Sequence, residues 1–445
     1  MCAGGFGMRG PKGVIPLVRL EREEDIPSLV VRLRPRETGT ARVRQSVRRS
    51  LDDVRRRGDA ALLDHTRAFD WPCSGPGALR VPPEEMFRAL AALPPALSRS
   101  LRQARRSIRS YHLRQKPVRF APLKKAGARM ALDAFPLESV GLYVPGGRAA
   151  YPSTLLMLAI PAQVAGVGRI AVASPAGPEG LPATVVLAAA ALLRLDEVYA
   201  LGGAAAIGAL AFGTTTVPRV DKILGPGNAW VAEAKRQVFG AVGIDAVAGP
   251  TELVILSDGS SPAAFVAADL LAQAEHDPEA CPLLLTTDAN EPGRVMAELS
   301  ARLAESSRAL IQKKSLKDRG AIVLCVGRNL ACAAARALAP EHLSVQARRP
   351  ESWARLVPTA AAVFLGPYTP EAAGDYGAGP NHSLPTGGTA RFSSPVGIWD
   401  FVRYRSTLAL DRGALLGVSP WMKAIALAEG LDGHAASLAV RGGVP

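Results

Sequence analysis

The sequence of 445 residues predicts an α/β fold in which parallel β-sheets are flanked by helices. From residue 136 onward, short apolar runs alternate with amphipathic segments long enough to form helices. Glycine or proline directly follows the runs, as Pro145 and Gly146 follow the run at 140–144. The unit recurs at roughly 25 residues, which is typical of strand–turn–helix units in a parallel sheet.

The expected strands form two series along the chain. The first series comprises residues 140–144, 170–173, 198–201 and 222–224, with expected helices at 155–167 and 229–239. The second series comprises residues 253–256, 283–285, 322–326 and 362–365. Pro262 marks the start of a helix after the first strand of the second series. Ala248-Gly249-Pro250 lies between the series, which favours two separate sheets over one continuous sheet.

The two ends of the chain predict helices. In the first 130 residues, the segments 83–93 and 96–114 are expected helices, and Pro94-Pro95 separates them. The residues after Pro395 predict a short helical appendage. At about 150 residues per domain, the length corresponds to roughly three domains.

Composition excludes several classes of protein. Hydrophobic residues make up 48% of the chain and charged residues 21%, a balance typical of globular proteins. We expect no membrane-spanning helix, because no apolar stretch reaches about 18 residues. We also expect no secretory signal, because the basic N-terminal residues are not followed by an apolar core. The five cysteines form no CxxC pair, which indicates reduced thiols in a cytoplasmic protein.

The net charge of +14 is concentrated near the N-terminus. Residues 1–130 contain 28 Lys+Arg and 12 Asp+Glu, whereas the remaining residues contain 25 and 27. The arginines recur at helical spacing beside Val43, Val47, Leu51 and Val54, which predicts an amphipathic helix with a solvated basic face. Because aromatic residues are not interleaved with these arginines, the pattern argues against a nucleic-acid partner.

Four of the six histidines can be interpreted from their positions along the chain. His65 and His112 lie on expected helices and are interpreted as structural. His276 lies three residues after Gln273 near the end of an expected helix, so both side chains project from one helix face. His434 lies in the C-terminal tail.

The two remaining histidines accompany carboxylates. Glu341 directly precedes His342 at the start of an expected strand. Asp375 and His382 belong to the segment 374–386, which is rich in glycine and proline and is typical of a functional loop. Glutamine, histidine and aspartate side chains of this kind suit Zn²⁺ in a catalytic site.

Taken together, these motifs resemble the histidinol dehydrogenase family. The resemblance runs from about residue 40 to the C-terminus. It is carried, in order, by Gly141–Gly147, Gly225–Asn228 with Ala232–Phe239, Ala248–Glu252, Gln273–His276, Pro340–Leu343, Gly374–Thr386 and Glu429–His434.

The resemblance implies an activity and a set of site residues. The implied reaction is a two-step, NAD⁺-linked oxidation of L-histidinol through L-histidinaldehyde to L-histidine, with one Zn²⁺ per subunit. The implied zinc ligands are Gln273, His276, Asp375 and His434. The implied acid/base pair is Glu341 and His342, and the implied NAD⁺ contacts are Tyr143 and Asn228. The implied substrate site comprises Thr251, Gln273, His276, His342, Asp375, His382, Glu429 and His434.

The resemblance also implies two incomplete Rossmann-like domains with small helical extensions at both termini. We therefore expect an N-terminal extension at 1–38, a main domain at 39–142 plus 251–395 that carries the zinc and acid/base residues, an NAD-binding domain at 143–250, and a C-terminal helical arm at 396–445. In a homodimer of this family the arm would complete the neighbour's site.

The chain departs from the family pattern in two places. Ala205 stands where the family usually has a glutamine expected to contact NAD⁺, and Thr251 replaces a serine. Two alternatives stay open. A paralogous zinc dehydrogenase would oxidise another primary alcohol to its acid, and a catalytically silent zinc protein would bind nucleic acid through its basic N-terminal face.

Overall fold

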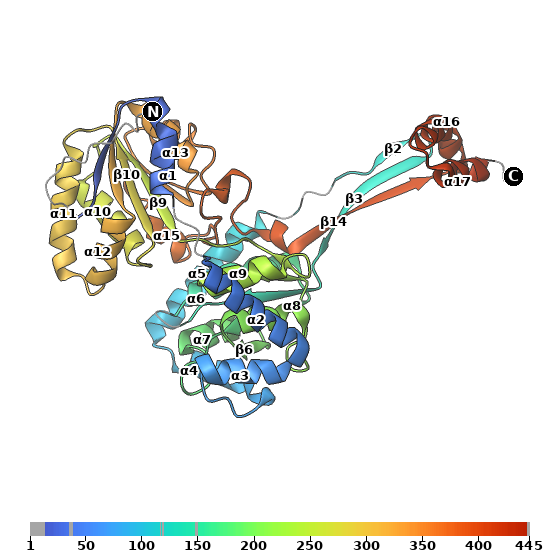
Figure 1. Cartoon of the computed structure of the whole chain (residues 1–445), viewed down its shortest axis with the longest axis horizontal. Coiled ribbons are helices and arrows are strands. Elements are labelled where there is room, and N and C mark those ends of the chain that lie inside the picture. Colours follow the sequence, from blue (N-terminus) through green and yellow to red (C-terminus); the bar gives the residue numbers. More distant parts are fainter. Residues whose placement is uncertain (1–13, 35–38, 116, 118–119, 147–149, 443–445) are drawn as a thin grey trace.

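The computed structural model describes residues 14–34, 39–115, 117, 120–146 and 150–442. Figure 1 shows two α/β bodies and an arm that extends away from them. This arrangement confirms the predicted fold class, because each body contains a parallel sheet flanked by helices. Among the described residues, no helix is both long and apolar enough to cross a membrane.

The first body is built on a five-stranded parallel sheet with the order β6-β5-β4-β7-β8. Its strands are β4 (Ser139–Tyr143), β5 (Arg169–Ser174), β6 (Val198–Ala200), β7 (Lys222–Leu224) and β8 (Gly243–Ile244). The strand order reverses between β4 and β7. In open parallel sheets, ligands bind beyond the carboxyl ends of the strands at such a reversal. The residues after Tyr143 and Leu224 therefore occupy the expected ligand-binding edge.

Helices cover both faces of this sheet. One face packs against α4 (Pro83–Ala92), α5 (Pro95–Leu113), α6 (Pro152–Ala165) and α7 (Thr184–Leu192). The other face packs against α2 (Ala41–Arg57), α3 (Asp59–Phe69), α8 (Gly203–Phe212) and α9 (Ala229–Val238). The apolar stripe of α2 packs against α8, and a Cβ at Gly208 would come within 3.2 Å of Leu51.

These contacts differ from the expected domain division. Residues 41–113 pack mainly on the body formed by residues 139–244, whereas the sequence analysis grouped 39–142 with 251–395. The physical reason is that the apolar stripes of α2–α5 are complementary to the outer helices of this sheet. A stripe in the sequence shows that a helix is buried, but it does not identify the surface that buries it.

The second body contains a six-stranded parallel sheet with the order β1-β11-β10-β9-β12-β13. Its strands are β1 (Leu17–Leu20), β9 (Glu252–Ser257), β10 (Cys281–Thr286), β11 (Ala321–Cys325), β12 (His342–Gln346) and β13 (Ala362–Leu365). The expected N-terminal extension thus contributes an edge strand, which pairs with β11.

Two apolar layers flank the second sheet. One layer contains α1 (Ile26–Leu33), α13 (Arg328–Leu338) and α14 (Pro350–Ala354). The other contains α10 (Ala263–Ala274), α11 (Glu291–Glu305) and α12 (Ala309–Asp318). The short helix α15 (Glu371–Asp375) contacts α10. Single-turn 3₁₀ helices lie at Glu23–Asp25, Pro76–Leu79, Thr389–Arg391 and Ile398–Phe401.

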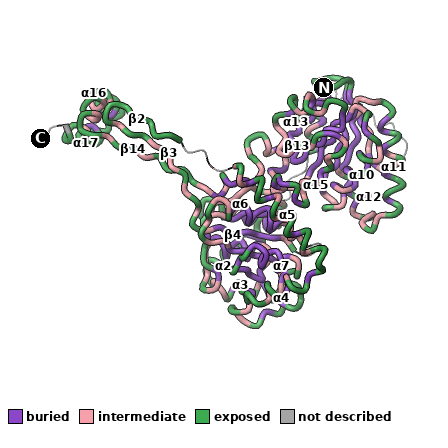
Figure 2. Tube along the Cα trace, turned by 180° about the vertical axis from the view of Figure 1, so that it is seen from behind, coloured by how far each residue is buried: buried purple, intermediate pink, exposed green. Residues whose placement is uncertain are grey.

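The arm is a three-stranded antiparallel sheet that ends in two helices (Figure 1). Its elements are β2 (Leu123–Lys125), β3 (Ala128–Pro136), β14 (Val402–Leu410), α16 (Arg412–Ala428) and α17 (Asp432–Gly442). The expected appendage was purely helical, and its strands were missed. Strand β14 pairs with β3 from Val402↔Pro136 to Leu410↔Ala128, so the arm also includes residues from the first third of the chain. Figure 2 shows that the arm is mostly exposed, unlike the interiors of the two bodies.

Candidate metal and active site

The candidate site is a cavity of about 650 Å³ that is lined by both bodies. The first body contributes loops that follow β4 and β7, including Gly146 and Asn228. The second body contributes residues near the amino ends of β9 and β12, together with the segment that contains α15. The residues on this side are Thr251, His276, Glu341, His342, Glu371, Asp375 and His382. The cavity therefore lies between the carboxyl edge of one sheet and the amino edge of the other.

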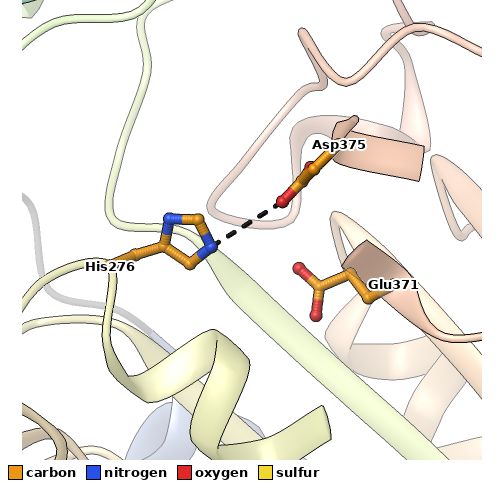
Figure 3. Close-up of side chains that lie close together, drawn as sticks. All are labelled: His276, Glu371 and Asp375. Carbon is orange, nitrogen blue, oxygen red and sulfur yellow. Dashed lines mark ion pairs between the residues drawn. The ribbon is translucent and has the colours of Figure 1, made fainter. Parts of the chain in front are cut away.

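Three of the predicted zinc ligands approach this cavity. Gln273 is buried on the last turn of α10, and His276 lies two residues beyond the helix end. Asp375 is the last residue of α15, and its Oδ2 lies 3.8 Å from His276 Nε2 (Figure 3). Gln273 Nε2 donates a hydrogen bond to Thr251 Oγ1 at 3.0 Å, whereas Gln273 Oε1 is buried without a hydrogen-bond partner.

This donor set fits a metal ion. A buried amide oxygen without a partner is costly, and a cation is one group that can satisfy it. An imidazole nitrogen and a carboxylate oxygen supply two further donors of the types that Zn²⁺ accepts. Burial by itself raises the pKa of Asp375, but the histidines around it outweigh that effect and lower the pKa. The carboxylate is therefore ionised, as a metal ligand must be.

Sequence reasoning missed one member of this cluster, Glu371. Glu371 and Asp375 are four residues apart on α15, so both carboxyl groups lie on the same side of the helix. One ligand atom from each of His276, Glu371 and Asp375 lies within 4.8 Å of the others. The (i, i+4) spacing of the two acidic residues was the available signal. Burial raises the pKa of Glu371 well above its usual value.

His342 and Glu341 lie at the start of β12, as the sequence analysis expected for a strand at this position. The ring nitrogen Nδ1 of His342 is 3.2 Å from the backbone carbonyl of Glu252. A carbonyl oxygen only accepts hydrogen bonds, so Nδ1 carries the proton and Nε2 is left with a free lone pair. Burial lowers the pKa of His342 to about 4, which keeps the imidazole neutral at physiological pH.

Glu341 is held by two donors. Its carboxylate accepts hydrogen bonds from the backbone N–H of Glu252 at 3.0 Å and from the hydroxyl of Thr251. Burial nevertheless raises the pKa of Glu341 well above its usual value. A carboxyl group with a raised pKa is a stronger base once it is ionised. Glu341 and His342 thus have the properties expected of an acid/base pair.

The predicted NAD⁺ contacts differ in accessibility. Asn228 lines the cavity, and its Oδ1 caps α9 by accepting from the backbone N–H groups of Trp230 and Val231. Tyr143 is buried, and its hydroxyl accepts a hydrogen bond from the N–H of Gly203 at the start of α8. Burial raises the pKa of Tyr143 to about 12, so the phenol remains protonated.

A buried ion pair holds the loop that precedes Asn228. Lys235 donates to the carbonyl of Gly225 at 2.8 Å and is paired with Asp245. The carboxylate of Asp245 in turn accepts from the N–H of Gly225 at 2.7 Å. Gly225 has φ +127°, and a Cβ there would lie 2.1 Å from the carbonyl oxygen of Tyr143. Glycine is therefore required, and Lys235 and Asp245 fix its orientation.

Two predicted residues lie elsewhere. Glu429 follows α16 and His434 lies on α17, at the far end of the arm and away from the cavity of the same chain (Figure 1). His382 does reach the cavity, where its Nδ1 lies 3.6 Å from Asp375 Oδ1. The described chain thus brings together every predicted zinc, substrate and acid/base residue except the two on the arm.

A dinucleotide-type sheet edge that faces metal donors and an imidazole base defines a class, the dinucleotide-dependent oxidoreductases. The family model of histidinol dehydrogenase matches residues 33–442. The chain belongs to the histidinol dehydrogenase family, whose members are NAD-dependent oxidoreductases.

Individual relatives agree with the family match. The histidinol dehydrogenase of Gluconobacter oxydans is 47% identical over 399 residues, which is 90% of this chain and 93% of the relative. That of Bordetella parapertussis is 47% identical over 392 residues, covering 88% of this chain and 89% of the relative. A crystal structure of histidinol dehydrogenase from Elizabethkingia anophelis superimposes with a TM-score of 0.91 at 31% identity, covering 97% of this chain and 99% of that one.

Proposed function

We propose that this chain is a cytoplasmic enzyme of histidine biosynthesis that oxidises L-histidinol to L-histidine in two zinc-dependent steps, each with one NAD⁺. The observation that carries this proposal is the buried oxygen of Gln273 that has no hydrogen-bond partner. The amide of Gln273 is hydrogen-bonded to Thr251, which lines the same cavity as His276 and Asp375. Zinc, when bound there, would supply a Lewis acid that anchors the nitrogen atoms of the substrate.

In the first oxidation, His342 is the base. Its free Nε2 takes the proton of the substrate hydroxyl while a hydride leaves the same carbon for NAD⁺, which gives L-histidinaldehyde and NADH. The neutral form that this step requires is favoured by burial, which lowers the pKa of His342 to about 4. Nδ1 keeps its proton and donates it in a hydrogen bond to the carbonyl oxygen of Glu252.

In the second oxidation, Glu341 activates water. Its carboxylate takes a proton from a water molecule that adds to the aldehyde carbon, and the resulting hydrate loses a second hydride to a second NAD⁺. The raised pKa of Glu341, caused by burial, makes the ionised carboxylate a competent base. Thr251 donates to this carboxylate and holds it at the wall of the cavity.

The cofactor would lie along the edge of the first sheet. Asn228 already lines the cavity there, and Tyr143 supports the adjacent start of α8. Ala205 lies in the first turn of α8, which follows β6 of the same sheet, and the family resemblance places a glutamine that contacts NAD⁺ at this position. The absence of this glutamine side chain would weaken NAD⁺ binding by up to about tenfold, which is the contribution of one hydrogen bond.

We further propose that the active enzyme is a homodimer in which each arm completes the neighbour's site. His434 of one subunit would then serve as the fourth zinc ligand of the other, and Glu429 would contact the substrate. Catalytic zinc sites keep a position open for substrate or water and can expand their coordination during the reaction. The exposed arm, which makes few contacts with the two bodies of its own chain, is consistent with this arrangement.

The test is the yield of NADH per mole of L-histidinol, measured to completion with zinc, after chelation, and after zinc is restored. Two NADH per histidinol, lost on chelation and recovered with Zn²⁺, is the expected result. One NADH would contradict the role given to Glu341. No NADH from a folded, zinc-loaded enzyme would contradict the substrate and would favour oxidation of another primary alcohol.

A further inference from the structure

The carboxyl group of Glu371 is buried in the site but has no role in the two oxidation steps proposed above. Glu371 is 2% exposed, and its Oε1 lies 3.5 Å from Nδ1 of His342. Its second oxygen, Oε2, is buried without a hydrogen-bond partner. Burying a carboxyl group is unfavourable unless a partner compensates, so its presence on the floor of the cavity calls for a function.

The surroundings of His342 indicate what that function is. Nδ1 faces three oxygen acceptors, namely the carbonyl of Glu252 at 3.2 Å, Glu371 at 3.5 Å and Glu341 at 3.7 Å. Glu341 already accepts from the N–H of Glu252 and from Thr251. Of the two carboxyl groups, that of Glu371 lies nearer to Nδ1 of His342.

We propose that Glu371 is a positioning residue that holds the Nδ1 side of His342, so that Nε2 faces the substrate as the base. This inference rests on the proposed function and extends it. The carboxyl oxygen of Glu371, together with the carbonyl of Glu252, favours a proton on Nδ1 and one orientation of the ring. When Nε2 takes a proton, the imidazolium that forms favours ionisation of Glu371, and the resulting carboxylate stabilises it. Substrate does not touch Glu371 in this arrangement; Glu371 acts through His342.

The position of Glu371 on α15 adds a second consequence. The same helical turn carries Glu371 and Asp375, and Figure 3 shows the Glu371 carboxyl group directed toward the space between His276 and Asp375. A rigid turn that carries both groups makes the geometry of the base depend on the geometry of the metal ligand. The competing role for Glu371 is that of a metal ligand, because it belongs to the same cluster of donor atoms.

The first experiment compares Glu371→Gln and Glu371→Asp in the zinc-loaded, full-length enzyme. For Glu371→Gln we expect kcat to fall by roughly 10²–10⁴-fold, as when the orienting carboxylate of a catalytic histidine is replaced. Zinc content and KM for histidinol should stay within about threefold, because ground-state binding does not use Glu371. Glu371→Asp should recover part of the lost kcat. Unchanged kcat in folded Glu371→Gln, or loss of zinc from it, would overturn the proposal.

Glu291→Gln is the matched control. Glu291 is also fully buried, but it accepts hydrogen bonds from Ser257 and Thr286 outside the cavity. If the loss of kcat reflected only the disturbance of a buried carboxyl group, both variants would lose activity together. A loss confined to Glu371→Gln supports positioning, and an equal loss in both contradicts it.

The second experiment does not depend on turnover of histidinol. The chain has only six histidines, so ¹⁵N labelling of histidine gives a simple NMR spectrum, in which His342→Gln identifies the ring of His342. We expect the Nδ1–H tautomer in the wild type and a mixture of tautomers in Glu371→Gln. An identical tautomer in both would overturn the proposal. A wild-type enzyme that makes no NADH from histidinol but shows the expected tautomer change would contradict only the proposed substrate.

Discussion

Gln273 and Thr251 form a hydrogen bond of 3.0 Å that sets the direction of the Gln273 amide. Because Nε2 is the donor, Oε1 is left without a partner in the buried space beside the metal donors. The hydroxyl of Thr251 has a single proton, which it donates in a hydrogen bond to the carboxyl group of Glu341. One hydroxyl group therefore links Gln273, a proposed zinc ligand, to Glu341, the residue proposed to activate water.

Replacing Thr251 by valine tests this link. Thr251→Val keeps the shape of the side chain and removes the hydroxyl, so the Gln273 amide loses the contact that orients it. We expect zinc affinity to fall by roughly 10–100-fold, the usual cost of losing a group that orients a metal ligand. Competition with a fluorescent chelator measures the affinity. Thr251→Ser is the control and should bind zinc like the wild type; an equally tight Thr251→Val would refute the link.

Mixing two inactive variants tests whether the His434 that completes a site belongs to the same subunit or to the neighbouring one. Subunits carrying His342→Ala and His434→Ala are co-expressed with different tags. If the arms are exchanged, each mixed dimer contains one intact site and one site with both defects. Random pairing then restores about a quarter of wild-type activity. If His434 served its own chain, every site would carry one defect, and the mixture would be as inactive as either variant alone.

Lys235→Met tests the buried ion pair between Lys235 and Asp245, which holds the loop that precedes Asn228. The change leaves the Asp245 carboxylate without its buried partner and frees the carbonyl of Gly225. Breaking a buried pair in this way costs about 3–5 kcal/mol of stability. We expect a lower Tm and a higher KM for NAD⁺, with little change in KM for histidinol. Lys314→Met, at an exposed pair with Asp318, should cost less than about 1 kcal/mol. Equal effects of the two variants would contradict the special role of Lys235.

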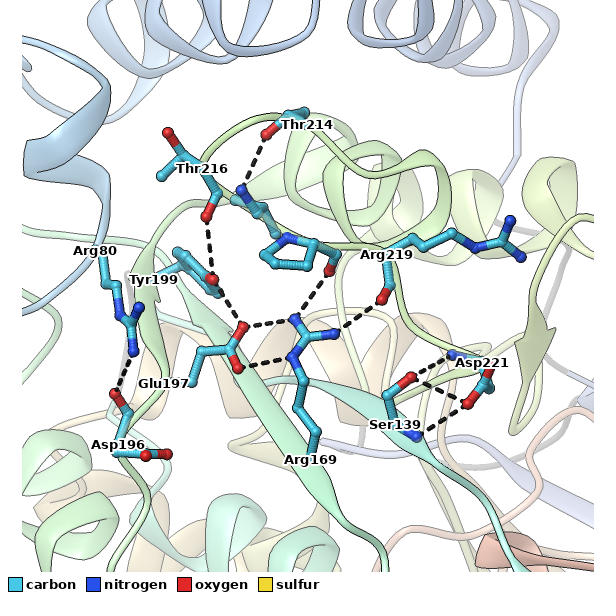
Figure 4. Close-up of polar contacts among 12 residues, drawn as sticks. Arg80, Ser139, Arg169, Asp196, Glu197, Tyr199, Thr214, Thr216, Arg219 and Asp221 are labelled. Carbon is cyan, nitrogen blue, oxygen red and sulfur yellow. Dashed lines mark hydrogen bonds and ion pairs between the residues drawn. The ribbon is translucent and has the colours of Figure 1, made fainter.

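The first body has an acid-sensitive contact between Arg169 and Glu197 (Figure 4). Burial alone raises the pKa of Glu197, but hydrogen bonds from Arg169 and Tyr199 outweigh burial and lower it. The stabilisation is therefore complete above the ordinary carboxyl pKa of 4.5 and is lost as pH falls through the lower folded value.

Glu197→Gln should accordingly destabilise the protein by about 1–3 kcal/mol at neutral pH, because it removes charge-assisted hydrogen bonds. Below about pH 4.5 the difference from the wild type should shrink, since the wild type loses the same contacts. Urea unfolding at a series of pH values measures the difference. Exposed Glu305→Gln is the control. A difference that stays constant down to acid pH would show that Glu197 does not titrate in this way.

The sequence predicted local structure better than long-range assembly. The eight strands of the two expected series are present, because all are continuous apolar runs bounded by turn residues, and most are buried on both faces. Strand β3 was missed because Ala128–Pro136 is largely exposed and gives no such run. Because strands β3 and β14 were not predicted, the sequence also did not show that the arm combines two distant parts of the chain.

For the site, the residues around Gln273, Glu341 and Asp375 were found through their motifs, and the fold brings them to one cavity. Glu371 was missed because a glutamate on a short helix resembles any solvated carboxylate until its burial is known, even with Asp375 four residues further on. The partners of Gly225 were missed for a similar reason, since nothing in a sequence pairs Lys235 with Asp245. Burial and pairing are properties of the fold as a whole, and local patterns do not encode them directly.

The pairing of β1 with β11 has a consequence for synthesis of the chain. Leu17 lies beside Ile322, so the first strand to leave the ribosome has a partner that is made about 300 residues later. At translation rates of roughly 5–20 residues per second, the delay is about 15–60 s. The first body can fold during that interval, but the second sheet cannot form completely until β11 has been synthesised. Strand β1 therefore needs protection from wrong partners until β11 has been made.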